Sequence, residues 1–136
     1  MALTVEKMYA GIQAGMAKAA GMGQKMSFCI MDEGGHVKIV VQGDGARWNT
    51  VDIAIGKAYT AVSFRRGTDA LFELAQKVPG FSGLETLFGG KVIMLPGGLV
   101  LMDGDQLVCG VSASGGSGEQ DVECAQAVVD ALKASL

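Results

Sequence analysis

The chain has 136 residues, 49% of them hydrophobic and 18% charged, which is enough apolar sequence for one domain with a buried core and excludes a disordered polypeptide. Eleven Lys and Arg residues against 14 Asp and Glu residues give a formal charge of −3, and no basic run stands out, so we expect no nucleic-acid partner. The longest strongly apolar stretch, Val92 to Met102, is interrupted by Pro96 and is too short to cross a bilayer, so we expect no membrane segment.

The first half of the chain alternates helical and strand patterns. Thr4 is a suitable N-cap for a helix whose apolar residues recur at helical spacing until two glycines stop them. Two short apolar runs, Met26–Asp32 and His36–Gln42, flank a glycine pair and predict a β-hairpin. Thr50 is placed to cap a second helix that continues to Arg66 and carries a face of small residues.

The second half predicts a further helix, a loop, three strands and a closing helix. Thr68 starts a short helix that ends near Lys77, and the glycine-punctuated segment Phe81–Gly90 is interpreted as a loop with one helical turn. Ser117 and Gln120 match a capping box for the last helix. Three apolar runs separated by turn residues predict an antiparallel meander over Lys91–Leu95, Gly98–Met102 and Gln106–Ser114.

This order of elements predicts a single α/β domain over residues 1–136, with one five-stranded antiparallel sheet flanked by helices. The meander strands are apolar on both faces, whereas a sheet with one wet face would alternate apolar and polar residues. We therefore expect both faces to be covered, either by helices or by another subunit.

The cysteines indicate a reduced, structural role. Cys29, Cys109 and Cys124 are far apart and form no Cys-x-x-Cys pair, which favours neither a disulfide framework nor a zinc site. The N-terminal segment interrupts its apolar residues with charged ones, unlike a secretory signal. We expect a cytoplasmic protein whose thiols are packed in the interior.

A glycine-rich loop, Gly115–Gly118, joins the last strand to the last helix and is the first candidate site. Backbone N–H groups converge there at the positive end of the helix dipole, where an anion or a carboxylate could bind. The other interpretation, which the residues alone favour, is a tight connection in which Ser117 caps the helix and the glycines only permit the turn.

The second candidate is His36, the only histidine in the chain. Its imidazole could ligate a metal or haem iron or act as a base near neutral pH, or it could simply form hydrogen bonds at the end of its strand. A site with two histidines from one chain is excluded.

Basic residues form the third candidate. Arg47, Lys57, Arg65 and Arg66 lie on or before the second helix, and Lys57 and Arg65 share roughly one helical face. They could pair with ligand carboxylates such as haem propionates. The alternative is a solvated helix face balanced by the nearby Asp52 and Asp69.

A series of motifs, in their order and spacing, resembles the GlcG/HbpS-like family, which includes the C-terminal domain of PduO-type adenosyltransferases. The similarity spans nearly the whole chain. The motifs are Met31–His36, Gly43–Arg47, Asp52–Ala61, Pro96–Gly98, Asp103–Gly104, Gly110–Gly116 and Gln120–Asp121.

The resemblance implies a profilin-like or PAS-like α/β/α domain that assembles as a homo-oligomer, and it implies haem as the cofactor. His36 is then the candidate iron ligand, and Arg47 and Lys57 are the candidate partners of acidic ligand groups. The resemblance places the pocket rim at Ser114, Gly115, Gly116 and Asp121, with Gly98 at the same pocket.

Our leading hypothesis is a cytoplasmic, oligomeric small-molecule-binding protein whose ligand is haem or a related tetrapyrrole. An alternative is a small catabolic enzyme or accessory factor acting on an organic acid, with Lys57 or Asp121 in proton transfer and the loop from Ser114 to Gly118 holding a carboxylate. A third is a purely structural subunit. The leading hypothesis requires the His36 turn and the Gly115–Gly116 turn to lie close together and enclose one shared pocket, or hollow.

Overall fold

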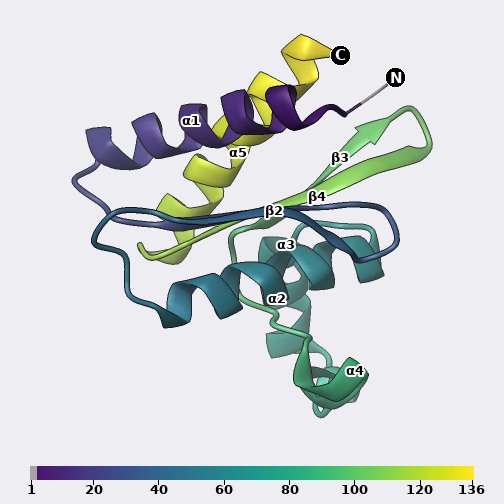
Figure 1. Cartoon of the computed structure of the whole chain (residues 1–136). Helices are drawn as coiled ribbons and strands as arrows, with labels where there is room; N and C mark the ends of the chain where they lie inside the picture. Colours follow the sequence, from purple (N-terminus) through teal and green to yellow (C-terminus); the bar gives the residue numbers. More distant parts are fainter. Residues whose placement is uncertain (1–2) are drawn as a thin grey trace.

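A computed structural model describes residues 3–136 as three layers, with helices on both faces of one sheet (Figure 1). Helices α1 and α5 cover one face, α2 covers the other with α3 beside it, and α4 lies farther from the sheet. The helices are α1 (Val5–Gly21), α2 (Asn49–Phe64), α3 (Thr68–Lys77), α4 (Leu87–Gly90) and α5 (Gly118–Ser135), with short 3₁₀ turns at Pro79–Phe81 and Leu84–Thr86. The strands are β1 (Ser27–Met31), β2 (Val37–Gln42), β3 (Gly98–Asp103) and β4 (Gln106–Ser114).

The sheet has four antiparallel strands in the order β2-β1-β4-β3. Two hairpins, β1–β2 and β3–β4, join along β1 and β4, where Ser27 pairs with Ser114 and Met31 pairs with Gly110. The predicted hairpin, the order of the helices and the antiparallel sheet are confirmed. The two inner strands are apolar and almost completely buried because helices pack on both of their faces.

The expectation of a fifth strand is wrong, because Lys91–Leu95 forms no ladder with any described strand. This apolar segment crosses the helical layer instead, and helix side chains satisfy its backbone. Thr60 Oγ1 accepts the Ile93 N–H at 2.7 Å, and Thr68 Oγ1 donates to the Leu95 carbonyl at 2.5 Å. The segment Lys91–Leu95 is apolar because it packs against α2. The absence of a side chain at Gly56 of that helix makes room for Ile93.

The core has two parts, one on each face of the sheet. The larger part lies between the sheet and α1 and α5, and includes Phe28, Ile30 and Val128. The smaller part lies against α2, whose small face brings Ala54 and Ala58 onto the sheet with no exposed surface. All three cysteines are buried and unpaired, as the sequence predicted.

Two of the three predicted helix caps are confirmed. Thr4 caps α1, and Ser117 forms a complete capping box with Gln120 at the start of α5. Thr50 does not cap α2: it lies inside the helix, buried, and its hydroxyl donates to the Arg47 carbonyl and hydrogen-bonds Ser27 Oγ at 2.7 Å. Within residues 3–136, none of the helices combines the length and apolar character needed to traverse a membrane.

Candidate functional site

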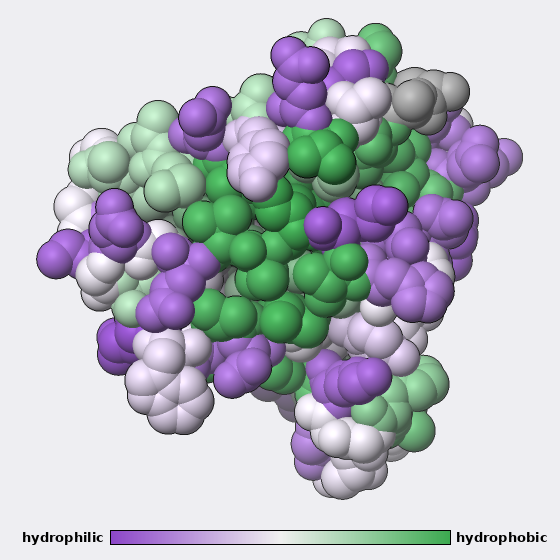
Figure 2. Space-filling model, in the orientation of Figure 1, coloured by the Kyte–Doolittle hydropathy of each residue, from purple (hydrophilic) through white to green (hydrophobic). Residues whose placement is uncertain are grey.

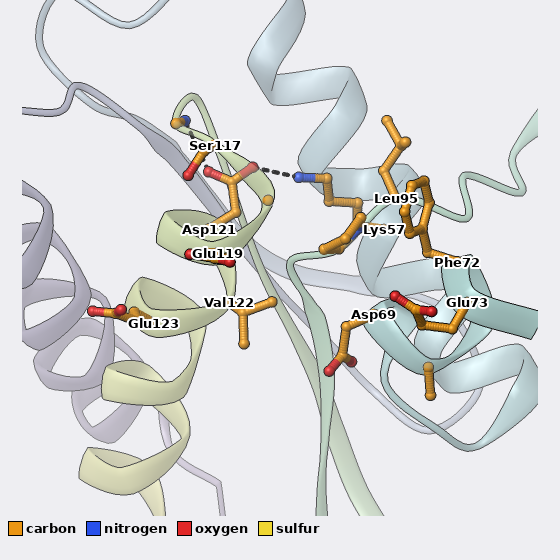
Figure 3. Close-up of a pocket in the computed structure, with 14 residues that line it drawn as sticks. Lys57, Asp69, Phe72, Glu73, Leu95, Ser117, Glu119, Asp121, Val122 and Glu123 are labelled. Atoms are coloured by element: carbon orange, nitrogen blue, oxygen red, sulfur yellow. Dashed lines mark hydrogen bonds and ion pairs between the residues drawn. The ribbon is translucent and has the colours of Figure 1, made fainter.

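A pocket of about 1030 Å³ opens between α3, α5 and the segment before β3 (Figure 3). Apolar side chains line part of it, namely Phe72, Leu95, Pro96 and Val122. Carboxylates also line it, Asp69 and Glu73 from α3 and Glu119 from α5, whereas the side chain of Glu123 points away from α3. At its base lie Lys57 of α2 and Asp121 of α5, joined by an ion pair.

The Lys57–Asp121 pair is almost completely withdrawn from water, with side-chain exposures of 3% and 5%. Lys57 Nζ lies 2.7 Å from Asp121 Oδ2 and also donates to the Ala113 carbonyl at 3.1 Å. The other carboxylate oxygen, Oδ1, accepts the Gly116 N–H at 2.8 Å. The pair therefore ties α2, the end of β4 and α5 together beneath the pocket.

The glycines before β3 make this arrangement possible. Gly97 has a φ of +125°, and a Cβ there would lie 2.9 Å from both Lys57 Nζ and Asp121 Cβ. A Cβ at Gly98 would collide with the Lys57 carbonyl group. The Pro96–Gly97–Gly98 motif thus lets the backbone pass directly beside the ion pair.

Burial and mutual attraction act in opposite directions on this pair. Desolvation lowers the pKa of Lys57, while the charge and hydrogen bond of Asp121 oppose that shift. Desolvation raises the pKa of Asp121, while Lys57 and the backbone N–H groups of Gly116 and Gly115 oppose it. Burial is the larger influence on both groups, so overall the pKa of Lys57 is lowered and that of Asp121 is raised, while their mutual attraction and hydrogen bond limit both shifts.

Two backbone donors of the Gly115–Gly118 loop are occupied by the protein itself. Asp121 accepts the Gly116 N–H, and the Gln120 side chain accepts the Ser117 N–H at 3.0 Å. The loop therefore holds a carboxylate, but that carboxylate belongs to Asp121. This geometry matches the tight-connection interpretation of the loop and leaves these two N–H groups without capacity for an external anion.

His36 lies at the opposite end of β1 from that loop. The loop follows Ser114, which pairs with the first residue of β1, whereas His36 lies beyond Met31, the last residue of this five-residue strand. At ~3.3 Å per residue the two turns are roughly 15 Å apart or more. The expectation of one hollow enclosed by both turns is therefore wrong for a single chain, and a ligand site shared by these two turns is ruled out. A site at His36 would have to be built from other residues around the β1–β2 turn.

The imidazole of His36 is 78% exposed and is oriented by Asp32. Asp32 Oδ1 accepts the backbone N–H groups of Gly34 and His36 at 2.9 Å each, and both carboxylate oxygens lie 3.2 Å from His36 Nδ1. The backbone N–H of His36 is the largest of the influences that hold the pKa of Asp32 below its usual value. Nε2 has no partner among residues 3–136 and faces solvent.

An aromatic pair lies next to this turn and was not anticipated from the sequence. A Cβ on Gly35 would lie 3.0 Å from the Tyr59 ring, so the turn rests against that ring. Tyr59 meets Phe88 edge to face, with 5.5 Å between ring centroids, and Lys91 Nζ lies 5.3 Å from the Tyr59 centroid. Phe88 is half exposed and has a left-handed φ of +56°, an unusual conformation for a bulky residue that no sequence pattern signals.

The structure separates the remaining predicted site residues. Lys57 and Asp121 come together, with Gly98 and Gly116 against them, while Ser114 and Gly115 lie beside this group and do not line the pocket. Arg47 is exposed before α2, at the opposite end of β2 from His36. Lys57 is not on a solvated face, and its partner is Asp121 rather than the neighbouring Asp52.

The carboxylate walls of the pocket were also missed. Asp69 and Glu73 are four residues apart on α3, as Glu119 and Glu123 are on α5, so each pair shares a helix face. This spacing was the available signal, but only the fold shows that α3 and α5 lie on either side of the pocket and that the Glu123 side chain points away from α3 (Figure 3).

Comparisons with known proteins agree on one family. The model of the family described as "Haem degrading protein HbpS-like" matches residues 3–130. An uncharacterized 15.0 kDa protein in the dhaT-dhaS intergenic region of Citrobacter freundii is 30% identical over 118 residues, which is 87% of this chain and 83% of that protein.

Solved structures give the same result. Klebsiella pneumoniae protein ORFY superposes with a TM-score of 0.91 at 28% identity, over 97% of this chain and 91% of that one. A structure described as a PduOC:heme complex superposes with a TM-score of 0.88 at 30% identity, over 96% of this chain and 95% of that one.

Proposed function

The chain belongs to the HbpS-like family, and we propose that it binds haem or a related tetrapyrrole at the β1–β2 turn, with His36 as the iron ligand. The supporting observation is the contact between Asp32 and His36. A metal-ligating histidine characteristically donates its second ring N–H to a carboxylate, which fixes the tautomer and leaves the other nitrogen free to ligate. His36 has that arrangement, with Nδ1 on Asp32 and Nε2 open.

The surroundings of the turn suit a flat, amphipathic ligand. Tyr59 and the half-exposed Phe88 offer aromatic surface, and Lys91 offers a cation for a carboxylate side chain of the ligand. The likeness to a PduOC:heme complex supports the same ligand class. When bound, haem would supply iron-centred redox chemistry, and the chain's own residues orient the imidazole and hold the ligand.

The acidic pocket is less suitable for this ligand. Its lining includes the carboxylates of Asp69, Glu73 and Glu119, and the lysine that lines it is already paired with Asp121. Carboxylates of haem, or of an organic acid, would enter a field of like charge. This is why we assign the ligand to the His36 turn.

We further infer that the protein acts as a homo-oligomer in the cytoplasm. Three buried, unpaired thiols suit a reducing compartment, and the open β2 edge of the sheet suits self-association.

A haemin titration followed in the Soret band tests the proposal. The wild-type protein should show a saturable shift at one equivalent per chain, and His36→Ala should weaken binding at least tenfold. Asp32→Asn should give an intermediate affinity, because the ring loses its orienting carboxylate. Glu73→Gln, in the pocket, serves as the matched control and should bind as the wild type does; a flat wild-type titration, or an unaffected His36→Ala, would refute the proposal.

A further inference from the structure

The pocket between α3 and α5 has no part in the proposed haem site, yet it has the size of a small-molecule site. Its volume of about 1030 Å³ matches the upper end of the roughly 300–1,000 Å³ typical of ligand pockets. It is separate from the His36 turn, because the Gly115–Gly118 loop that borders it lies at the opposite end of β1. Two properties of its lining, apolar surface and unpaired negative charge, indicate the class of ligand that it fits.

The apolar surface of the pocket comes from three separate segments of the chain. Val122 of α5 projects toward α3 (Figure 3), and Phe72 comes from α3. Leu95 and Pro96 come from the segment before β3, and Leu95 is 47% exposed. This surface is distinct from the hydrophobic area that Figure 2 shows over β2, since no residue of that strand lines the pocket. Covering apolar surface removes it from water, which is favourable, so a fitting ligand has an apolar part.

Unpaired negative charge borders this apolar surface. Asp69 and Glu73 of α3 and Glu119 of α5 line the pocket, and within residues 3–136 none of these three carboxylates forms a hydrogen bond or an ion pair. The ammonium group at the base of the pocket, that of Lys57, is already paired with Asp121. A carboxylate on an ordinary helix surface needs no partner, because water solvates it. These three differ because they border an apolar hollow, where the low dielectric of the walls strengthens their common field.

The arrangement of carboxylates on α3 adds a repulsion that a bound cation would relieve. Asp69 and Glu73 are four residues apart and share a helix face, and like charges at this spacing destabilise a helix. Asp69 lies in the first turn, where the helix dipole favours a carboxylate, but Glu73 lies in the second turn and gains little from the dipole. Lys77, the next residue on this face, forms no ion pair with Glu73. The face of α3 that lines the pocket is therefore complementary to a positive charge.

We propose that this pocket binds an organic cation, an ammonium group carried on an apolar body such as an aromatic ring. The ammonium group lies between Asp69 and Glu73, and the apolar body covers Val122 and Leu95. A bare metal ion fits less well, because within residues 3–136 no three acidic, histidine or cysteine side chains are grouped closely enough to hold one. An organic anion is repelled by the same charges that disfavour the carboxylates of haem here.

Four probes that differ in charge and in apolar body test the site. 2-Phenylethylammonium has both features, 2-phenylethanol has the ring without the charge, 3-phenylpropanoate has the ring with a negative charge, and methylammonium has the positive charge alone. Titrations followed through the amide resonances of Glu73 and Val122 should show saturable binding of 2-phenylethylammonium, at least about fivefold tighter than that of 2-phenylethanol. The other two probes should bind more weakly still. Added salt should reduce the preference for the ammonium probe, because it screens the carboxylates.

Two variants separate the contribution of the charge from that of the apolar surface. Glu73→Gln removes one carboxylate and should weaken the binding of 2-phenylethylammonium by about two- to fivefold, while the affinity for 2-phenylethanol stays unchanged. Val122→Ala shortens the apolar wall and should weaken the binding of both probes by similar factors. Glu6→Gln, the same change on the exposed surface of α1, is the matched control and should alter neither affinity. Thermal unfolding of each variant separates lost binding from lost folding.

Three results would overturn this site: no saturable binding of 2-phenylethylammonium, an equal affinity for the neutral probe, or resonance shifts confined to the β1–β2 turn. The site does not rest on the proposed function, and exchanging the variants keeps the two apart. His36→Ala should retain its affinity for 2-phenylethylammonium, just as Glu73→Gln should retain its affinity for haemin. Saturable amine binding with a flat haemin titration would refute the haem proposal alone, and the reverse pattern would refute the cation site alone.

Discussion

Lys57 Nζ and Asp121 Oδ2 lie 2.7 Å apart although 64 residues separate them in the chain, and both side chains are almost fully buried. Their contact joins α2 to α5 across the end of β4. The pair lies at the base of a pocket, yet each member is already satisfied by the protein. We therefore interpret it as a structural tie, and its energetics give the first prediction.

Replacing one member of this ion pair should lower the free energy of unfolding much more than replacing both. Lys57→Met leaves the Asp121 carboxylate buried without its cation and should cost about 3–5 kcal/mol in the free energy of unfolding. Lys57→Met combined with Asp121→Asn, which can still accept the Gly116 N–H, should recover a large part of that loss. Urea denaturation of the three proteins measures this, and a double variant as unstable as Lys57→Met would contradict the account.

Gly97 should be far less tolerant of substitution than another glycine with positive φ. Gly97→Ala forces a Cβ against Lys57 Nζ and Asp121 Cβ, whereas Gly104, at a φ of +60°, has open space around it. Gly104→Ala should cost only the backbone strain of about 1–2 kcal/mol, and Gly97→Ala should cost more than that. Equal melting temperatures for the two variants would show that the close approach has no energetic weight.

The thiols should be unreactive until the protein unfolds. Burial raises the pKa of Cys29 and of Cys109 to about 12, and burial together with nearby carboxylates raises the pKa of Cys124. The thiolate is the reactive form, so the native protein should react slowly with an aromatic disulfide reagent at pH 8. After denaturation, all three thiols should react, and the reagent should release three equivalents of its chromophore per chain. Rapid modification of one thiol in the native state would place that residue outside the core.

The β1–β2 turn should loosen in acid. The pKa of Asp32 is lowered in the folded protein, chiefly by the backbone N–H of His36. The carboxylate therefore contributes its full stabilisation of the turn at pH values above its unfolded pKa of 3.8. That contribution is lost as the pH falls through the folded pKa. The amide resonances of Gly34 and His36 should shift with this titration, and Asp32→Asn should abolish the shift; a titration midpoint above 3.8 would contradict the assigned hydrogen bonds.

Local patterns predicted the elements whose hydrogen bonds are local. The hairpin, the capping box at Ser117 and the small face of α2 all follow from residues close together in the chain. The prediction of a fifth strand over Lys91–Leu95 was wrong because the hydroxyl groups of Thr60 and Thr68, which are distant in sequence, form hydrogen bonds that a neighbouring strand would otherwise have formed. Apolar character alone does not distinguish these two environments.

The candidate site was less predictable because it depends on long-range geometry. His36 was identified as a possible ligand, but its distance from the Gly115–Gly116 turn follows from the pairing of β1 with β4, which no local motif encodes. The aromatic pair of Tyr59 and Phe88 depends on how the segment after α3 folds back on α2. Conversely, the loop that looked suited to an external anion is filled by Asp121, one turn into its own helix.

Chemical rescue tests the central claim, that His36 ligates haem iron, most directly. His36→Gly should bind haemin weakly and lack the absorption spectrum of the histidine-ligated wild type. Added imidazole should restore that spectrum and the affinity, because the free ring replaces the missing side chain. A His36→Gly variant whose spectrum and affinity equal those of the wild type without imidazole would show that another group holds the iron.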